Sequence, residues 1–442
     1  METPKISRRD FNKSAALGAV SLALSAGPAV HNVLGANDRI GIGLIGSGGM
    51  GRADLRDFLR TEQVDAIAIA DPYQPNLDEG LGMTLGKAKG YKDFRQVLDH
   101  KDIDAVIVAT PDHWHAIPMI AACEAGKDVY QEKPLSHTLH EGRRMVQAAE
   151  KHNRVVQVGT QQRSGEHFQK AVELVRGGKI GKVCYADTWI YGNEYPEGLG
   201  NPPNTDPPEW LDWDLWLGPA PKVPFNRNRC IGTFRWFWDY SGGTLTDWGV
   251  HLIDIVHWAM GVDAPRTVVA AGGKYLIEDN RETPDTLQVV FEYPPSPVSG
   301  KAFVVRFENR VVNAHGPDGH GYGIEFYGTD GTLFIDRSGY TLWPEPLRVG
   351  PERVSTSNVV KGEGSAQHYP HVLNFLDCVR SRQKPNSDVE TTHRSTSAPL
   401  IANVAYKLGR KLTWDRDQEQ FPGDAAANRL LTKEYRKPWV VA

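Results

Sequence analysis

Two charged residues, Glu132 and Lys133, stand where the surrounding sequence predicts the end of a buried strand. Residues 128–131 are typical of a short strand and residues 138–152 of a helix. Pro134 ends the strand, because it has no N–H for the ladder and restricts the residue before it. One interpretation is a strand-end ion pair that reaches solvent. The other is a ligand site, because open α/β sheets bind ligands at the carboxyl ends of their strands.

A glycine-rich motif indicates which sheet this strand belongs to. An apolar run at 40–45 precedes Gly46-Ser47-Gly48-Gly49-Met50-Gly51, and a predicted helix to about residue 60 and a second strand at 64–70 follow it. Asp71 ends that strand, 20 residues after Gly51. This order is the fingerprint of a dinucleotide-binding βαβ unit.

Each residue of the motif has an expected role. Gly46 makes the tight turn, Gly48 lets the backbone approach a pyrophosphate, and Gly51 lets the helix pack on the strand. The helix N-terminus attracts the phosphates. Asp71 is expected to accept hydrogen bonds from the ribose hydroxyls and to repel a 2′-phosphate, so NAD is favoured over NADP as the cofactor.

The alternation of strands and helices continues to residue 159, with strands predicted at 105–109, 129–131 and 155–159. This pattern predicts a parallel, doubly wound sheet whose strand ends line one crevice, so Glu132 and Lys133 face the nicotinamide half of that crevice. The predicted cofactor-binding residues are Gly46, Ser47, Gly48, Gly49, Met50, Gly51, Asp71, Thr110, Pro111, His115, Glu132 and Lys133.

Beyond residue 165 strand-like runs dominate, and Thr329-Asp330-Gly331 is a hairpin signal. We therefore expect an α/β Rossmann N-terminal domain and an α+β C-terminal domain with a large, mostly antiparallel sheet. The expected boundaries are a signal segment at 1–36, an NAD-binding domain at 37–160, and a substrate and oligomerisation domain at 161–442.

One predicted helix of the second half, at 241–261, is apolar enough to be buried and yet carries Asp247, His251 and Asp254. Their spacing of i, i+4, i+7 predicts one shared face. One interpretation is a satisfied core pair in which Asp247 caps His251. The site interpretation is favoured because an imidazole titrates near neutrality, as a proton acceptor must, and because Gly242-Gly243 permit close approach to a ligand.

Taken together, the glycine motif, Glu132-Lys133-Pro134 and Asp247-x-Gly249-x-His251 resemble the Gfo/Idh/MocA oxidoreductase family, which includes glucose–fructose oxidoreductase and inositol dehydrogenase. The resemblance runs from Arg39 to the C-terminus, and its end resembles the exported bacterial branch. It implies that Lys133, Asp247 and His251 line the reacting centre. It also implies assembly through the flat face of the second-domain sheet, as a homodimer or homotetramer.

The chemistry of these residue types suits alcohol oxidation, in which the O–H proton leaves as hydride passes to the cofactor. His251 is the best base and Lys133 an ammonium that holds the reacting oxygen, although which of the two takes the proton stays open. Asp247 fixes substrate hydroxyls or the lysine. Further substrate-binding candidates are Arg163, Trp236 and Asp254. Twelve tryptophans suit stacking on a sugar face or filling the domain junction.

Composition excludes several classes of function. A net charge of −4 and the absence of a Lys/Arg block argue against nucleic acid as a partner. The four cysteines have no short spacing, which argues against a Cys-x-x-Cys metal or redox site. His113-Trp114-His115 has no further ligand set with suitable spacing, so no metal site is expected.

The N-terminus predicts export. Arg8-Arg9 precede Phe11, Lys13 and a weakly apolar run too interrupted for a membrane span, which resembles a twin-arginine signal. The alternative is a disordered basic tail. Residues 1–36 carry four Lys/Arg and two Asp/Glu, so their removal would change the net charge from −4 to −6. The expected partner is the twin-arginine export machinery and the expected location is the periplasm.

The leading functional hypothesis is an NAD-dependent oxidoreductase acting on a secondary hydroxyl of a sugar, polyol or glycoside, with NAD tightly retained. The second is a redox-neutral NAD-dependent glycosidase or lyase that acts through a keto-sugar intermediate. The third is a catalytically inactive sugar-binding protein, which is disfavoured because both Lys133 and His251 are present.

Overall fold

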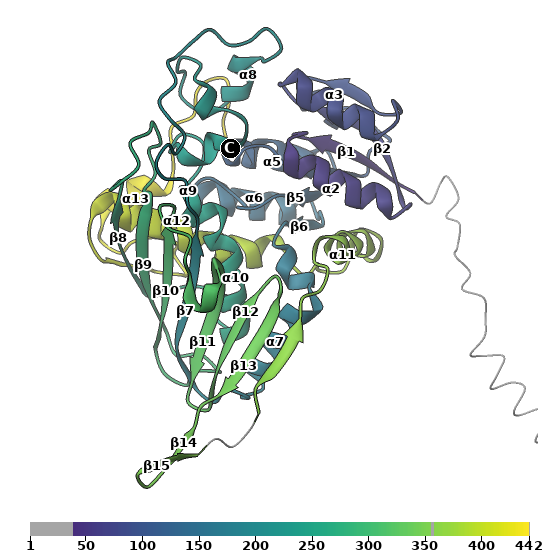
Figure 1. The fold of residues 1–442 in the computed structure, drawn as a ribbon. Helices are drawn as coiled ribbons and strands as arrows, with labels where there is room; N and C mark the ends of the chain where they lie inside the picture. The colour runs from purple at the N-terminus through teal and green to yellow at the C-terminus, as the bar shows by residue number, and fades with distance from the viewer. Residues whose placement is uncertain (1–38, 355–357, 442) are drawn as a thin grey trace, which may run out of the picture. The chain divides into compact units, whose positions relative to one another are not determined.

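The computed structural model describes residues 39–354 and 358–441. The predicted signal at 1–36 therefore lies outside the described residues. The compact unit that begins at residue 40 contains two large sheets and a two-stranded one (Figure 1). The first has six parallel strands in the order β3-β2-β1-β4-β5-β6, and the second has nine strands in the order β16-β13-β12-β11-β7-β10-β9-β8-β17.

The six-stranded sheet follows from continuous apolar runs. All six residues of β1 (Ile40–Ile45) are buried, as a strand covered on both faces requires. Helices connect the strands. The elements of this half are α2 (Gly49–Arg60), β2 (Val64–Ala70), α3 (Gln74–Met83), β3 (Lys89–Tyr91), α4 (Arg95–Leu98), β4 (Ala105–Val108), α5 (Ala116–Glu124), β5 (Asp128–Gln131), α6 (Leu139–Lys151) and β6 (Val156–Val158).

Helix α6 begins where a capping box satisfies its first N–H groups. The Thr138 hydroxyl accepts a hydrogen bond from the Glu141 amide at 3.3 Å, and the Glu141 carboxylate accepts one from the Thr138 amide at 2.9 Å. Pro134 and Leu135 thus lead directly from β5 into a fixed helix, which holds Lys133 at the strand end.

The nine-stranded sheet is antiparallel except for the pair β7/β10, which is parallel. The expected fold class is therefore confirmed, and the hairpin at Thr329-Asp330 joins β11 to β12. The strands are β7 (Val183–Tyr191), β8 (Thr267–Gly273), β9 (Thr286–Tyr293), β10 (Phe303–Arg310), β11 (Tyr322–Gly328), β12 (Gly331–Asp336), β13 (Gly339–Pro344), β16 (Val360–Glu363) and β17 (Leu412–Thr413), and a separate hairpin consists of β14 (Leu347–Val349) and β15 (Glu352–Val354).

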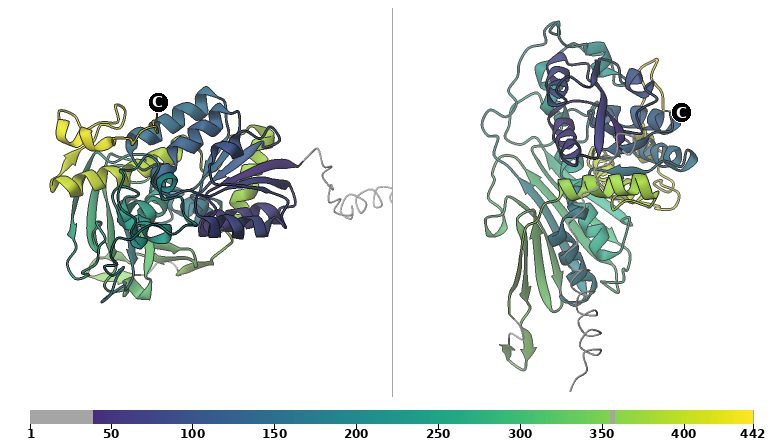
Figure 2. Two further views of the ribbon diagram at one scale, coloured as in Figure 1. Left: turned by 90° about the horizontal axis from the view of Figure 1, so that it is seen from above. Right: turned by 90° about the vertical axis from the view of Figure 1, so that its right-hand side faces the viewer.

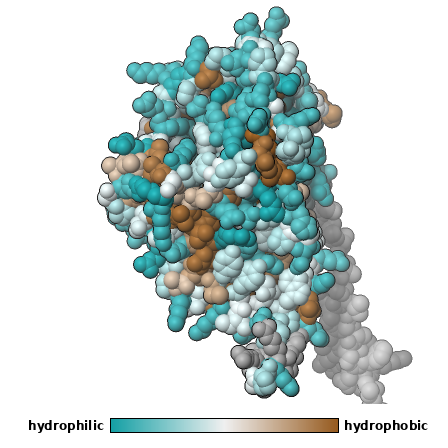
Figure 3. Space-filling model, turned by 60° about the vertical axis from the view of Figure 1, so that its left-hand side comes forward, coloured by the Kyte–Doolittle hydropathy of each residue, from teal (hydrophilic) through white to brown (hydrophobic). Residues whose placement is uncertain are grey.

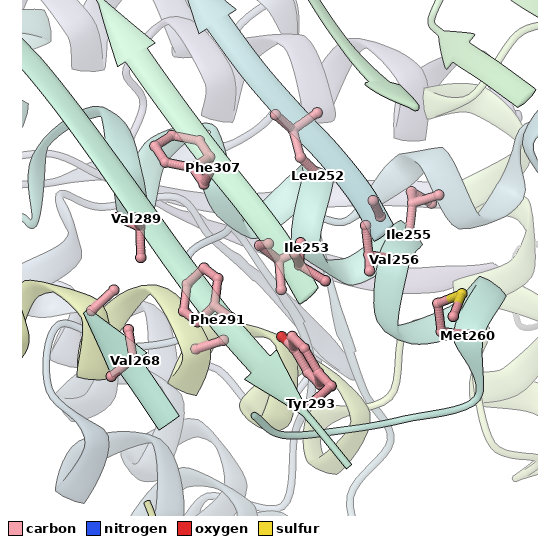
Figure 4. Close-up of a cluster of buried hydrophobic side chains, with 14 of the residues drawn as sticks. Leu252, Ile253, Ile255, Val256, Met260, Val268, Val289, Phe291, Tyr293 and Phe307 are labelled. Carbon is pink, nitrogen blue, oxygen red and sulfur yellow. The ribbon is translucent and has the colours of Figure 1, made fainter. Parts of the chain in front are cut away.

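Helices cover one face of this sheet and enclose the largest hydrophobic core. Figure 4 shows its centre, where Phe291 and Phe307 of the strands meet Leu252, Ile253 and Val256 of a helix. All five are essentially inaccessible to solvent. The helices of this half are α7 (Glu166–Arg176), α8 (Trp213–Leu217), α9 (Gly243–Asp247), α10 (Gly249–Met260), α11 (His368–Ser381), α12 (Val389–Leu408) and α13 (Ala425–Asn428).

The C-terminal part of the chain returns to the parallel sheet. Phe375 of α11 packs edge-on against Phe58 of α2, with ring centroids 5.9 Å apart, and Trp439 packs against Trp114 at 4.7 Å. Figure 2 shows α11 lying beside the first half of the chain. The expected second domain of residues 161–442 thus contributes a helix and a tail to the core of the first.

The molecular surface is mostly polar on the face drawn in Figure 3, where hydrophobic residues form separate patches. Within the described ranges, the helices are too short or too polar to span a bilayer.

Candidate active site

The glycine loop after β1 has the shape of a dinucleotide cradle. Gly46 has φ +91° and a Cβ there would lie 2.7 Å from the backbone of Ala109, while a Cβ on Gly51 would lie 2.1 Å from the Gly46 carbonyl oxygen. By contrast, Cβ atoms on Gly48 and Gly49 would meet no heavy atom within 4 Å. Gly46 and Gly51 are therefore needed for packing. Gly48 and Gly49 leave open space above the N-terminus of α2, as a bound pyrophosphate requires.

Asp71 ends β2 beside this loop. Its carboxylate accepts hydrogen bonds from the amides of Ser47 at 2.8 Å and Tyr73 at 2.9 Å. Burial raises the pKa of Asp71 to about 6, and the two amides counteract part of that effect. The group is therefore mostly ionised at neutral pH, where it can bind ribose hydroxyls and repel a 2′-phosphate. The glycine loop and Asp71 are therefore suited to bind NAD.

A pocket extends from Asp71 to Lys133 along the strand ends. Its walls come from both halves of the chain. One wall includes Gly46, Gly48, Gly49, Met50, Asp71, Thr110, Pro111, Glu132 and Lys133, and the other includes Leu215, Trp216, Ile231, Gly232, Phe234 and Arg235. The structure thus brings most of the predicted cofactor residues to one cavity.

The second wall is fastened to the adenosine end of the pocket. The amide of Gln74 donates to the Trp210 carbonyl at 2.9 Å, and the amide of Asp212 donates to the Pro72 carbonyl at 3.0 Å. The Tyr73 and Trp210 rings meet edge-on, with centroids 5.0 Å apart. We call these contacts, between residues 72–74 and 210–212, the latch.

Lys133 and Asp247 meet at the other end of the pocket. Lys133 Nζ lies 2.7 Å from Asp247 Oδ1 and also donates to the Asp247 carbonyl oxygen at 3.1 Å. Arg235 Nε donates to the same Oδ1 at 2.9 Å. Burial alone would raise the pKa of Asp247, but the charges of Lys133 and Arg235 outweigh it and hold that pKa well below its usual range. Asp247 is therefore a carboxylate that positions two cations.

Arg235 was missed by the sequence reasoning. It lies in the aromatic run Phe234–Trp238, where a lone arginine carries no motif. Only the tertiary fold brings it to Asp247, because the segment that follows α8 closes over the pocket.

His251 is buried near this pair but makes no hydrogen bond to Asp247 among the described residues. Burial, followed by the charges of Lys133 and Arg337, holds the pKa of His251 well below its usual value. Its Nδ1 is buried without a hydrogen-bond partner in the described structure. The imidazole is neutral at physiological pH, which is the state that a proton acceptor needs.

The prediction of one helix that carries Asp247, His251 and Asp254 on a shared face is wrong. Asp247 ends α9, Trp248 interrupts the helix, and His251 and Asp254 belong to α10. The Asp247 carbonyl is used by Lys133 instead of continuing the helix. A core pair in which Asp247 caps His251 is likewise not present.

Gly242 and Gly243 serve packing, contrary to the expected approach to a ligand. A Cβ on Gly242 would lie 2.5 Å from a methyl carbon of Thr246, and one on Gly243 would lie 2.9 Å from Thr283.

The three further substrate candidates lie elsewhere. Arg163 and Asp254 form a buried bidentate ion pair at 2.7 and 2.8 Å, to which the Ser395 hydroxyl adds a bond at 2.6 Å. Trp236 packs beneath the guanidinium of Arg281 at 5.6 Å. Among the described residues that line the pocket, none of the three is found.

His115 acts on the backbone and does not line the pocket. Its Nδ1 lies 2.7 Å from the Pro134 carbonyl oxygen and its Nε2 lies 2.8 Å from that of Thr110. The ring thus ties the loop after β4 to the loop that carries Lys133.

Glu132 is buried behind Lys133. Its carboxylate accepts hydrogen bonds from Gln161 Nε2 at 2.9 Å and from the Lys133 amide at 3.2 Å. Burial raises the pKa of Glu132 to about 7, although the charge of Lys133 lowers it. A second buried carboxyl, Asp54 on α2, has its pKa raised by burial and by Glu132. The interpretation of Glu132 as part of a strand-end ion pair that reaches solvent is therefore wrong.

In the described part of the chain, no three His, Cys, Asp or Glu residues gather as metal ligands. His113 instead contacts the Trp216 carbonyl oxygen through Nε2 at 3.1 Å.

This two-domain fold, with a nucleotide cradle and a Lys–Asp pair at its far end, is that of an NAD-dependent oxidoreductase. Residues 40–160 match the Gfo/Idh/MocA model described as "Oxidoreductase family, NAD-binding Rossmann fold". Residues 187–275 and 361–441 match its "Oxidoreductase family, C-terminal alpha/beta domain". The chain belongs to the Gfo/Idh/MocA oxidoreductase family.

Characterised relatives point the same way. The chain is 26% identical over 298 residues to myo-inositol 2-dehydrogenase of Thermotoga maritima, covering 67% of this chain and 75% of that protein. It is 23% identical over 330 residues to scyllo-inositol 2-dehydrogenase (NAD(+)) of Bacillus subtilis, covering 74% and 82%. Levoglucosan dehydrogenase, solved with NADH and levoglucosan, has a similar fold, with a TM-score of 0.63, 18% identity and coverage of 85% and 99%. An NAD-dependent sugar or polyol oxidoreductase is confirmed at this level.

Proposed function

We propose that the protein oxidises a secondary hydroxyl of a sugar, polyol or glycoside, with NAD held tightly in the pocket between the two halves of the chain. The observation that carries the proposal is the Lys133–Asp247 pair at 2.7 Å, which lies at the end of a pocket that begins at the glycine loop. The inositol and levoglucosan dehydrogenases among its relatives support this substrate class.

The residues divide the work of alcohol oxidation. Lys133, which donates to the ionised Asp247, binds the reacting oxygen and stabilises the negative charge that develops on it. We assign acceptance of the hydroxyl proton to His251, which its low pKa keeps neutral. NAD, when bound, supplies the hydride acceptor for the C–H bond that breaks. Arg235 donates to the same oxygen of Asp247 and helps to hold the carboxylate toward Lys133.

Tight retention of NAD is supported by the latch. In this proposal, NAD leaves when residues 210–212 separate from residues 72–74, which breaks two backbone hydrogen bonds and the Tyr73–Trp210 contact. A Kd near 1 nM corresponds to about −12 kcal/mol, against about −8 kcal/mol for a micromolar, freely exchanging cofactor. The proposal expects the tighter value.

We also propose export by the twin-arginine route, from the sequence of residues 8–30. A protein exported in its folded state carries its cofactor with it, and little free NAD is available outside the cytoplasm. Re-oxidation of the bound cofactor by a second sugar, or by reversal on the first, then completes the cycle.

Assembly as a homodimer or homotetramer is proposed through the sheet face that the helices leave uncovered. This face carries an aromatic cluster around Trp189, Tyr191 and Phe334, and the ion pair of Arg306 with Asp187 at 2.5 Å. Light scattering of the purified protein tests this part. A monomer at micromolar concentration would contradict it.

The functional proposal is tested by purifying the protein without added cofactor, dialysing it, and assaying the denatured supernatant for nicotinamide. We expect the protein to carry a near-stoichiometric amount of NAD(H). We also expect added sugar to reduce the bound NAD. An empty protein with micromolar NAD exchange would favour an ordinary soluble-cofactor dehydrogenase.

A further inference from the structure

The reacting centre carries more positive than negative charge. Asp247 Oδ1 accepts hydrogen bonds from Lys133 Nζ at 2.7 Å and from Arg235 Nε at 2.9 Å. One carboxylate therefore serves two cations. His251 near them is neutral and adds no charge to this group.

A third cation, Arg337, acts on His251 and packs over Trp248. Its guanidinium carbon is 4.9 Å from the centre of the Trp248 ring, and the Trp248 ring is 6.1 Å from that of His251. Within the described ranges Arg337 forms no salt bridge, and its buried Nε has no hydrogen-bond partner. Its charge contributes to the low pKa of His251. Arg337 is thus a partly buried cation without a counter-ion.

Among the acids near the centre, Asp112 attracts Arg235 and offsets part of the charge at that end, so the charge that lacks a partner is that of Arg337. Asp254 is neutralised by its bidentate bond to Arg163. Burial raises the pKa of Glu132 to about 7, so it is only about half ionised at neutrality. Asp57 on α2 raises the pKa of His368, but burial and the charge of Arg337 outweigh this effect and lower that pKa.

We infer that the substrate is a sugar that carries an acidic group, either a carboxylate or a phosphate, bound by the guanidinium of Arg337 with Arg235 adding to the positive field. A guanidinium whose buried Nε has no partner is unfavourable, and its planar donors match the oxygens of a carboxylate or phosphate. The oxidised nicotinamide ring of NAD is itself cationic, so the ring does not neutralise the positive charge near the reacting centre. The inference rests on the proposed function and names the substrate class of that same site.

The test uses the full-length, NAD-loaded protein and matched sets of sugars. Each set has a neutral hexose, its uronate and its 6-phosphate, for glucose, galactose and mannose, and kcat/KM is measured from the appearance of reduced nicotinamide. At least one acidic member should exceed its neutral parent by about tenfold or more, as expected for one charge-assisted contact. Which acid is preferred identifies the group.

Variants connect that preference to Arg337. The ratio of kcat/KM for the acidic over the neutral sugar should fall about tenfold in Arg337→Gln and be partly restored in Arg337→Lys. Arg266→Gln, at the exposed residue just before β8, is the matched control and should leave the ratio unchanged. Should Arg337→Gln fail to fold, the wild-type preference should still fall as ionic strength rises.

Two results would overturn the inference. If the neutral hexoses are used as well as, or better than, their acidic relatives, the inference is wrong and the proposed function still stands. Absence of NAD reduction with every member of every set would remove both.

Discussion

Replacing Glu132 by glutamine should stabilise the protein, by an amount that depends on pH. Glu132 is 4% exposed, and burial raises its pKa from 4.5 to about 7 against the opposing effects of Lys133 and Gln161. Because the folded-state pKa is raised, the stabilising contribution of the protonated carboxyl is complete below pH 4.5 and is lost as pH rises through 7. A change from 4.5 to about 7 corresponds to about 3 kcal/mol, at about 1.4 kcal/mol for each tenfold change in the acid constant.

Glutamine has the shape of the protonated carboxyl and can still accept the hydrogen bond from Gln161. Glu132→Gln should therefore exceed the wild type in free energy of unfolding by about 3 kcal/mol above pH 8, and the difference should vanish near pH 4.5. Urea unfolding followed by tryptophan fluorescence at intervals between pH 5 and pH 8.5 measures it. The exposed Glu124→Gln on α5 is the matched control.

A difference between the two proteins that is the same at every pH would refute this reasoning. So would a glutamine variant that is less stable at high pH. Either result would mean that attraction to Lys133 outweighs the burial of the carboxylate, and that Glu132 is ionised in the folded protein throughout this range.

Three further predictions concern the pocket. Asp71→Ala should weaken NAD binding by about 1.5–3 kcal/mol for each charge-assisted hydrogen bond lost, and it should relax discrimination against NADP. Titration with both cofactors measures this, and unchanged affinity and preference would contradict the assignment of Asp71. Lys133→Met and His251→Asn should each reduce turnover by about 10²-fold or more while NAD still binds; near-full turnover in either variant would remove its catalytic role. Trp210→Ala should speed NAD release by about 3- to 10-fold by removing its ring contact with Tyr73, as stopped-flow exchange would reveal, and an unchanged rate would contradict the role of the latch.

The cofactor half could be predicted closely because its signals are local. Gly46 and Gly51 are required by the tight turn and by close packing, and the motif that contains them lies within six consecutive residues. Asp71 follows from its place at the end of β2. The parallel sheet follows from apolar runs that alternate with helices, and these repeat within short stretches of sequence.

The reacting centre was only partly predictable because tertiary contacts decide it. Lys133 and Asp247 are 114 residues apart in sequence, and the helix that the apolar pattern predicts as continuous is interrupted at Trp248. Arg235 reaches the same carboxylate from an irregular segment without periodicity. Asp254 has the spacing of a site residue but turns to Arg163. Spacing along a helix fixes a face only as long as the helix is unbroken.

The central claim, that Lys133 and Asp247 serve NAD-dependent oxidation of a sugar hydroxyl, is tested most directly in a single turnover. NAD-loaded protein is mixed with an aryl glycoside or free sugar, and reduced nicotinamide, keto-sugar and released aglycone are quantified together. We predict reduced nicotinamide and keto-sugar in equal amounts, without aglycone, and about 10²-fold slower formation of both in Lys133→Met. Release of aglycone without net reduction of NAD would contradict the account and establish redox-neutral glycoside cleavage instead.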